Sequence, residues 1–350
     1  MLAGLDAALI LLGVDAPVTA DRLPEAHGML MTLGFVGTLV CLERAVALGR
    51  PMGFAAPALL GVGSLLLVTP LPWAVGRTAL VLGMVGMCGL YVPLWRRQRD
   101  DAVLVQALAA VLGLGAASMW LGGVEVAPLV PWLAGFLVLT IAGERLELAR
   151  LAMGPAAGPT LVLLTTGVLA ATVASLLWPV PGYPLLGLAL VALTGWLLQH
   201  DVARRTIRSD GLTRFVAAGM LAGYFWLLVA GGTWLVHGEA LDGGAYDVVV
   251  HATFLGFTIS MIMAHGPVIL PAVLRRPLPY RTVLWVPLVL LHASLLLRLW
   301  LGDALHVRQA WQIGGTLNVV ALLLFFGLAG WLVVSHGGHR RRLRVPERSA

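Results

Sequence analysis

The sequence predicts an all-α, polytopic membrane protein built as one bundle of helices. Of its 350 residues, 59% are hydrophobic and only 11% are charged, whereas about a quarter of the residues in a soluble domain carry a charge. Apolar runs of about 20 residues, each long enough to cross a bilayer, recur along the chain. We therefore expect a lipid bilayer as the principal partner and about 12 transmembrane helices.

Proline, glycine and charged residues divide the apolar runs into segments. A short first segment, Leu2–Leu12, is interrupted by Asp6 and lacks the basic start of a signal peptide. The later segments are predicted at Glu25–Leu48, Phe54–Leu71, Arg77–Trp95, Ala102–Leu121, Leu129–Leu151, Thr160–Trp178, Leu185–Gln199, Leu212–Val236, Ala245–Leu274, Thr282–Leu301 and Trp311–Ser335. We expect residues 1–336 to form one transmembrane domain and residues 337–350 a basic tail.

The arginines predict the orientation of this bundle. They cluster in the loops after even-numbered segments and in the tail, while the opposite face has only Arg22, Arg77, Arg298 and Arg308. Short cytoplasmic loops carry an excess of basic residues, so we expect a bacterial cytoplasmic (inner) membrane protein with its C-terminus in the cytoplasm. The net charge of +6 is explained by this pattern and does not indicate a nucleic-acid partner. Two cysteines inside apolar segments predict no disulfide framework.

Three segments resemble one another. GFVGTLVCLERAVALGR begins at Gly34, GFLVLTIAGERLELAR at Gly135 and GFTISMIMAHGPVILPAVLRR at Gly256, and nine residues after these glycines stand Glu43, Glu144 and His265. The spacing of about four segments between echoes predicts three related four-helix units. Coincidence is the alternative, because Gly-Phe is a common dipeptide in apolar sequence.

The segment Tyr246–Arg276 contains two histidines that only uncharged residues separate. The separation of fourteen positions from His251 to His265 corresponds to roughly 21 Å along an ideal helix, so one small ligand cannot touch both. A buried polar group needs a partner and often marks a site. We therefore expect two sites, one toward each end of this helix.

The exterior site is predicted to hold b-type haem. His27, at the start of the second segment, and His251 share one membrane level, and two imidazoles on facing helices provide axial ligands. Gly34 and Gly256 would give the macrocycle room, and Arg298 and Arg308 would bind its propionates. The alternative is two histidines that bond neighbouring helices without a cofactor.

The cytoplasmic-side residues Glu43, Glu144 and His265 are predicted as a proton-entry cluster or a metal site of oxygen and nitrogen ligands. Arg44 and Arg145 beside the glutamates favour simple ion pairs as the alternative. His292, near the middle of its segment, is a candidate for a second metal or a proton relay. The metal candidates are thus His27, His251, His292 and His265, and the catalytic candidates His292, Glu43, Glu144 and His265.

Parts of the chain resemble the NnrS family of membrane proteins. EAHGMLMTLGFVGTLV in the second segment is similar to that family's HEMLFGF segment, and HATFLGFTISMIMAHGPVILPAVLRRPL followed by LLHASLLLRLW is similar to its other recognisable region. The resemblance implies haem, copper and a role in nitric oxide metabolism or nitrosative stress, with His27 and His251 as metal ligands. Glu25 stands where the family has the first histidine of a His-x-His pair, which weakens the expectation of copper.

The chain also has a distant likeness to the main subunit of haem-copper oxidases, which has low-spin haem ligands on helices 2 and 10. The sixth and seventh segments contain no histidine, however, so the usual three-histidine copper site is not expected. We predict a haem protein acting on nitric oxide. If it is an enzyme, its expected reaction is nitric oxide reduction, and the sequence does not identify the electron donor. A secondary transporter with an intramembrane Glu/His site and a non-catalytic haem- or copper-handling protein are the alternatives.

Overall fold

A computed structural model describes residues 1–274 and 278–342, and in these ranges the chain forms helices and no strands. The elements are α1 (Leu2–Leu11), α2 (Arg22–Met29), η1 (Leu30–Gly37), α3 (Thr38–Leu48), η2 (Pro51–Phe54), α4 (Ala55–Leu67), α5 (Trp73–Gln98), α6 (Asp101–Leu121), η3 (Ala127–Leu129), α7 (Val130–Met153), α8 (Ala157–Leu177), α9 (Pro179–His200), α10 (Ala203–Thr206), α11 (Gly211–His237), α12 (Gly243–His251), η4 (Ala252–Ile259), α13 (Ser260–Leu274), η5 (Thr282–Leu284), α14 (Trp285–Leu295), η6 (Leu296–Ala304) and α15 (Arg308–Arg342).

The prediction of an all-helical, multi-pass membrane bundle is confirmed. Within the described ranges, ten continuous helical spans are long and apolar enough to cross a membrane, and Leu2–Leu11 and Pro51–Leu67 are shorter apolar helices. Each predicted segment corresponds to one of these. Large apolar side chains such as Val180, Val236 and Leu163 lie 72% to 89% exposed on the outside, as a surface facing lipid requires.

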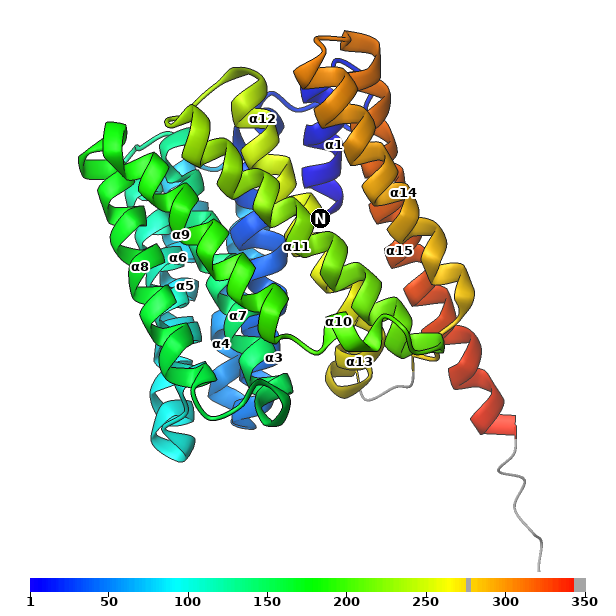
Figure 1. Cartoon of the computed structure of the whole chain (residues 1–350). Coiled ribbons are helices and arrows are strands. Elements are labelled where there is room, and N and C mark those ends of the chain that lie inside the picture. Colours follow the sequence, from blue (N-terminus) through cyan, green and yellow to red (C-terminus); the bar gives the residue numbers. More distant parts are fainter. Residues whose placement is uncertain (275–277, 343–350) are drawn as a thin grey trace, which may run out of the picture.

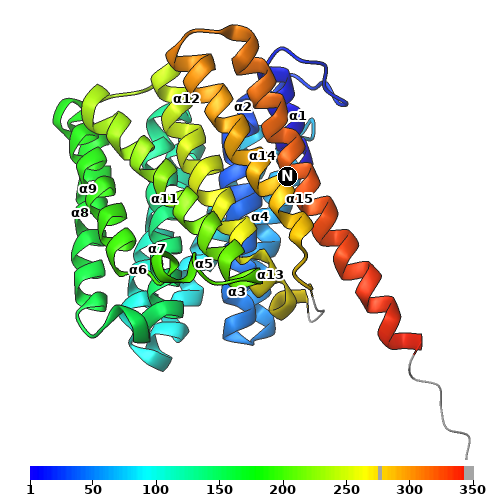
Figure 2. The same ribbon diagram turned by 45° about the vertical axis from the view of Figure 1, so that its right-hand side comes forward.

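The bundle has a broad half and a projecting pair of helices (Figure 1). α8 and α9 lie at one edge, and α14 and α15 lie together at the opposite edge, where the lower part of α15 projects away from the other helices (Figures 1 and 2). The span containing α7 is the most enclosed, with 78% of its apolar stretch buried, compared with 33% for α5 and α8. The side chains around α7 are therefore the best shielded from the surroundings of the bundle.

Three of the long spans are interrupted by π-helix. η1, η4 and η6 continue α2, α12 and α14 without a break in the chain. The Gly-Phe dipeptides at Gly34 and Gly256 fall inside η1 and η4, whereas the one at Gly135 lies in regular α-helix. A π-turn bonds residue i to i+5, and such turns are rare and frequent at functional sites. The ideal-helix geometry assumed for His251 and His265 therefore does not apply, because η4 lies between them.

The last helix continues further than the sequence predicts. α15 runs to Arg342, past the expected end at Ser335. The expected tail at 337–350 is thus helical as far as its described part extends, and residues 343–350 lie outside the described ranges.

Candidate functional site

His27 and His251 line one cavity, here called the histidine cavity. Its walls come from α1, α2, η1, α7, α12, η4, η6 and α15, and about 810 Å³ there is free of atoms, part of it open to the surroundings. Apart from the two imidazoles and Arg298, the walls are mostly apolar, and they include Leu5, Met31, Val36, Val130, Leu133, Leu137, Val250, Phe254, Leu255, Val319 and Leu322.

The short first helix positions His27. The carbonyl oxygen of Gly4 in α1 lies 2.9 Å from Nδ1 of His27, so Nδ1 carries the hydrogen and donates it. The absence of a side chain on Gly4 eases this approach, because a Cβ there would lie 2.5 Å from Sδ of Met31 and the Met31 side chain would have to move. The contact fixes the tautomer of His27 and leaves the lone pair on Nε2.

A carboxylate positions His251. Nδ1 of His251 lies 3.0 Å from the backbone oxygen of Asp247 and 3.0 Å from its Oδ1. The same carboxylate accepts two hydrogen bonds from Arg298, at 2.7 and 2.8 Å, and one from Nε1 of Trp311, at 3.2 Å. The guanidinium of Arg298 also lies over the Trp311 ring, 5.3 Å from its centre. A carboxylate that accepts from one imidazole nitrogen makes the other a better metal ligand.

Two features of His27 and His251 are among those that a bis-histidine haem would need. Such a site needs two neutral imidazoles on different helices, each with one free nitrogen, next to dry apolar space. In the part of the chain that the structure describes, Nε2 of His27 and Nε2 of His251 have no hydrogen-bond partner, and both residues line the histidine cavity. A buried polar nitrogen without a hydrogen bond is costly, so a ligand at the two Nε2 atoms would offset that cost.

Three residues predicted around the haem are placed differently. Gly34 and Gly256 do not line the histidine cavity. Each faces a neighbouring helix, since a Cβ on Gly34 would clash with Ser64 and one on Gly256 would clash with Trp226. They allow helices to pack closely and leave no open space. Arg308 is exposed at the start of α15 and lies outside the cavity lining.

Arg298 lines the histidine cavity as predicted for a propionate partner, but much of its charge is engaged. Its Nε and Nη2 bond both oxygens of Asp247, so within the described residues only Nη1 lacks a partner. A single propionate could be bound there.

His292 bonds through both nitrogens. Nε1 of Trp226 donates to Nδ1 of His292 at 2.9 Å, Nε2 lies 3.2 Å from Oγ of Ser260, and Ser260 donates to the carbonyl of Gly219 at 2.7 Å. Because the serine hydrogen goes to Gly219, Nε2 of His292 is the donor to Ser260. The imidazole is neutral and has no free lone pair, which argues against the predicted metal or relay role.

A second cavity lies below the first and is called the carboxylate cavity. It is lined by Glu43 of α3, by Glu144 and Arg145 of α7, by His265 of α13 and by apolar residues that include Met1, Phe35, Leu39, Val40, Ile141, Met261, Ile262, Phe325 and Phe326. About 1300 Å³ there is free of atoms, part of it open. Val36, Leu137 and Thr258 line both cavities, so the two are neighbours.

The two glutamates in this cavity differ in their partners. Oε1 of Glu43 accepts from Arg44 at 2.7 Å, and Arg44 also bonds Glu147 at 3.0 Å. Glu144 makes no ion pair or hydrogen bond among the described residues, and its buried Oε1 has no partner. The predicted alternative of a glutamate paired with the arginine next to it therefore applies to Glu43 and not to Glu144.

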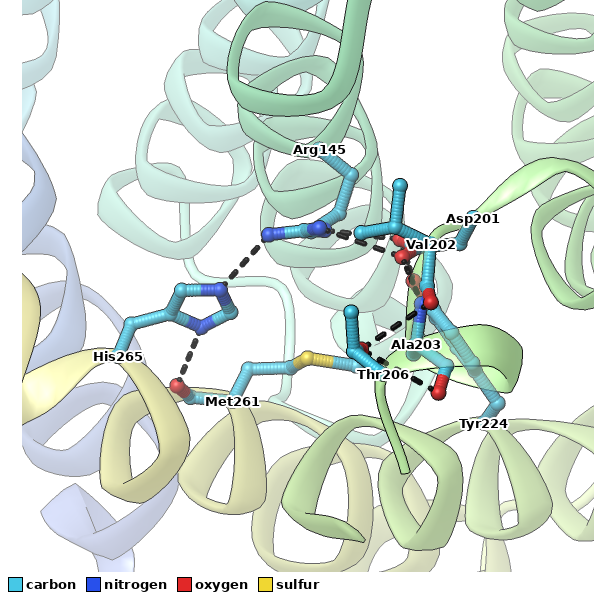
Figure 3. A network of polar contacts seen from close by, with 8 residues as sticks. All are labelled: Arg145, Asp201, Val202, Ala203, Thr206, Tyr224, Met261 and His265. Carbon is cyan, nitrogen blue, oxygen red and sulfur yellow. Dashed lines mark hydrogen bonds and ion pairs between the residues drawn. The ribbon is translucent and has the colours of Figure 1, made fainter. Parts of the chain in front are cut away.

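Arg145 joins four elements in a network shown in Figure 3. Its Nε and Nη2 bond Asp201 at 2.9 and 3.2 Å, and its Nη1 lies 2.9 Å from Nε2 of His265. Asp201 also accepts from Tyr224 at 2.8 Å and from the backbone of Ala203 at 2.9 Å. Since Nδ1 of His265 donates to the carbonyl of Met261, neither nitrogen of His265 is free to bind a metal.

The chain was compared with models of protein families. The model of a family described as a domain of unknown function, DUF8744, matches residues 1–334. The chain belongs to the DUF8744 family. No curated protein and no solved structure matches it.

The residues of this DUF8744 member offer no conventional multidentate metal site. Within the described ranges, no group of three or more His, Cys, Asp or Glu side chains is placed to hold a metal ion. Glu43, Glu144 and His265 line one cavity but do not form such a group. A copper centre consequently has no support from the geometry, whereas a two-histidine haem site does not need a third ligand.

The roles of three residues of this DUF8744 chain were not predicted from the sequence. Asp247 orients His251, and its position four residues earlier, one helical turn away, was a usable signal. Asn318 of α15 lines the histidine cavity and donates to Ser294 at 2.6 Å, while its buried Oδ1 has no partner. Gly4 acts through its backbone carbonyl, which no side-chain pattern indicates.

Proposed function

We propose that this chain is a membrane haem protein that binds b-type haem between His27 and His251 and acts in nitric oxide metabolism or nitrosative stress defence. One observation supports the haem most directly. Two imidazoles from separate helices line a single apolar cavity, each with Nδ1 hydrogen-bonded and Nε2 free. The nitric oxide role is supported by the resemblance of the second and tenth segments to NnrS proteins.

The residues of the chain divide the work of holding the cofactor. The carbonyl of Gly4 and the carboxylate of Asp247 keep the axial imidazoles in the ligating tautomer. Arg298 neutralises Asp247 and has one nitrogen left for a propionate. The apolar walls exclude water from the cavity, which small uncharged molecules can enter from the lipid.

When bound, haem supplies one-electron chemistry, and the protein controls its potential and access. Nitric oxide is small and apolar enough to reach the cavity through the hydrocarbon region. If the protein is an enzyme, its reaction is a reduction of nitric oxide; the alternative within the same reading is a protein that handles haem without catalysis.

A secondary transporter is the second candidate, because Glu144 is an unpaired carboxyl at membrane depth. Intramembrane acidic residues are typical of ion and substrate pathways. The free Nε2 atoms of His27 and His251 have no role in that reading, so haem content separates the two candidates.

The test is a reduced-minus-oxidised optical spectrum of the purified protein and of His27→Ala and His251→Ala. We expect a low-spin b-type α band in the parent protein and its loss in both variants. His237→Ala, which changes a histidine outside the histidine cavity, is the matched control and should keep the band.

Well-folded protein without haem after growth with ample iron would refute the proposal and favour the transporter. If haem is present, consumption of nitric oxide with a chemical reductant distinguishes a reductase from a handling protein.

A further inference from the structure

The carboxylate cavity combines apolar walls with one polar end. Phe35, Phe325 and Phe326 form an aromatic group on its wall, with ring centres 5.4 Å apart for Phe35 and Phe326 and 5.2 Å apart for Phe325 and Phe326. At the polar end stand Glu43, Glu144 and Arg145. A long molecule with an apolar tail and a compact polar head matches this division.

The unpartnered oxygen of Glu144 is the anomaly that a ligand would explain. A buried polar atom without a hydrogen bond is unfavourable, and every other acidic or basic side chain named around this cavity has a partner. The oxygen lies in a cavity lining, where a bound molecule can reach it.

The carboxylates around the cavity disfavour an anionic head group, because Glu43 and Glu144 would repel a phosphate or a fatty-acid carboxylate. The charge of Arg145 is balanced by Asp201. A neutral head that offers a hydroxyl to Glu144, or a carbonyl to the remaining N–H of Arg145 Nη1, satisfies both sides.

We propose that the carboxylate cavity binds the head group of a membrane quinol, with the ring against the phenylalanines and one ring hydroxyl donating a hydrogen bond to Glu144. An aromatic wall packs favourably against a flat ring. The isoprenoid tail would leave through the apolar side of the cavity. This binding site is separate from the haem site, and the inference holds whether or not haem binds.

The test measures binding of decyl-ubiquinol, kept reduced under nitrogen, to the purified protein by isothermal titration calorimetry, together with extraction and mass spectrometry of quinol or quinone retained during purification. We expect about one retained quinol or quinone per chain. Glu144→Met should weaken binding about tenfold or more, and it should raise the unfolding temperature because it removes an unpartnered polar atom. Ile262→Trp, which fills the cavity, should abolish binding.

Glu147→Gln is the matched control, since Glu147 lies one turn further along α7 and outside the cavity lining; its affinity should equal that of the parent. If Ile262→Trp fails to fold, Leu39→Trp replaces it. The proposal would be overturned if Glu144→Met bound the ligand with unchanged affinity, or if decylbenzene, which has no oxygen, competed for the cavity equally well. Phospholipid as the only extracted lipid would also overturn it.

Discussion

Four buried or partly buried histidines use their ring nitrogens in two ways. His265 and His292 bond through both nitrogens, to Met261 and Arg145 and to Trp226 and Ser260. His27 and His251 bond through Nδ1 and leave Nε2 free. A ligand to iron needs a free nitrogen lone pair, so the hydrogen bonds of each residue separate candidate ligands from histidines that hold helices together.

The prediction at this scale concerns His292→Phe. The change leaves Nε1 of Trp226 without its acceptor, so the unfolding free energy should fall by about 1–2 kcal/mol. Haem content should not change, because His292 is not in the lining of the histidine cavity. Thermal unfolding and the pyridine haemochrome spectrum measure the two effects. Loss of haem in this variant would restore His292 as a cofactor ligand.

At the scale of elements, one ion pair connects helices that are far apart in sequence. Arg145 on α7 bonds Asp201, which follows α9 and caps α10, and Tyr224 on α11 completes the group. Arg145 and Asp201 are only 5% and 3% exposed. In such a place the pair fixes helix positions, and removal of one partner strands a buried charge.

We expect Asp201→Asn to reduce the free energy of unfolding by about 3–5 kcal/mol. The double variant Arg145→Met, Asp201→Leu should recover much of that loss, because it leaves no unpaired charge. Chemical denaturation of the single and double variants measures this coupling.

The exposed pair of Arg150 and Asp100, in which Arg150 is 64% exposed, is the matched control. Arg150→Ala should cost no more than about 1 kcal/mol. Equal losses at the two pairs would mean that burial does not set the contribution of Arg145.

At the scale of the whole molecule, we expect the lower end of the bundle in Figure 1, with α10 and α13, to face the cytoplasm because of the arginine pattern. A green fluorescent protein fused after residue 350 should therefore fluoresce, and alkaline phosphatase at that position should be inactive. Fusions in the loop between α11 and α12 should give the opposite result, since that loop lies at the other end (Figure 1). Phosphatase activity from the C-terminal fusion would invert the orientation.

The helices could be predicted closely where charge and apolar periodicity mark their ends. The segment expected at Ala102–Leu121 is α6, Asp101–Leu121, whose first turn is capped by the Asp100 side chain at 3.1 Å from the amide of Ala102. The segment expected at Leu185–Gln199 begins earlier, at Pro179. Proline was treated as a break, yet at the first helical position it needs no amide hydrogen and favours the helix.

The site could be predicted only in part. Apolar context and helix pairing placed His27 with His251 and Glu43 with Glu144 and His265, because these depend on depth along the helices. The roles of Gly34, Gly256 and His292 were not predictable, since they depend on Ser64, Trp226 and Ser260 from other elements. The π-helical η1 and η4 also carry no recognised sequence signal, and they change which face each residue occupies.

The wall of the histidine cavity has a consequence for biosynthesis. His27 leaves the ribosome early and His251 much later, and Gly315, Asn318, Val319 and Leu322 of α15 complete the enclosure last. If this cavity binds haem as proposed, its wall is complete only after α15 has been inserted, and stable loading would follow that step. A chain truncated before α15 would then remain in the membrane as an apoprotein.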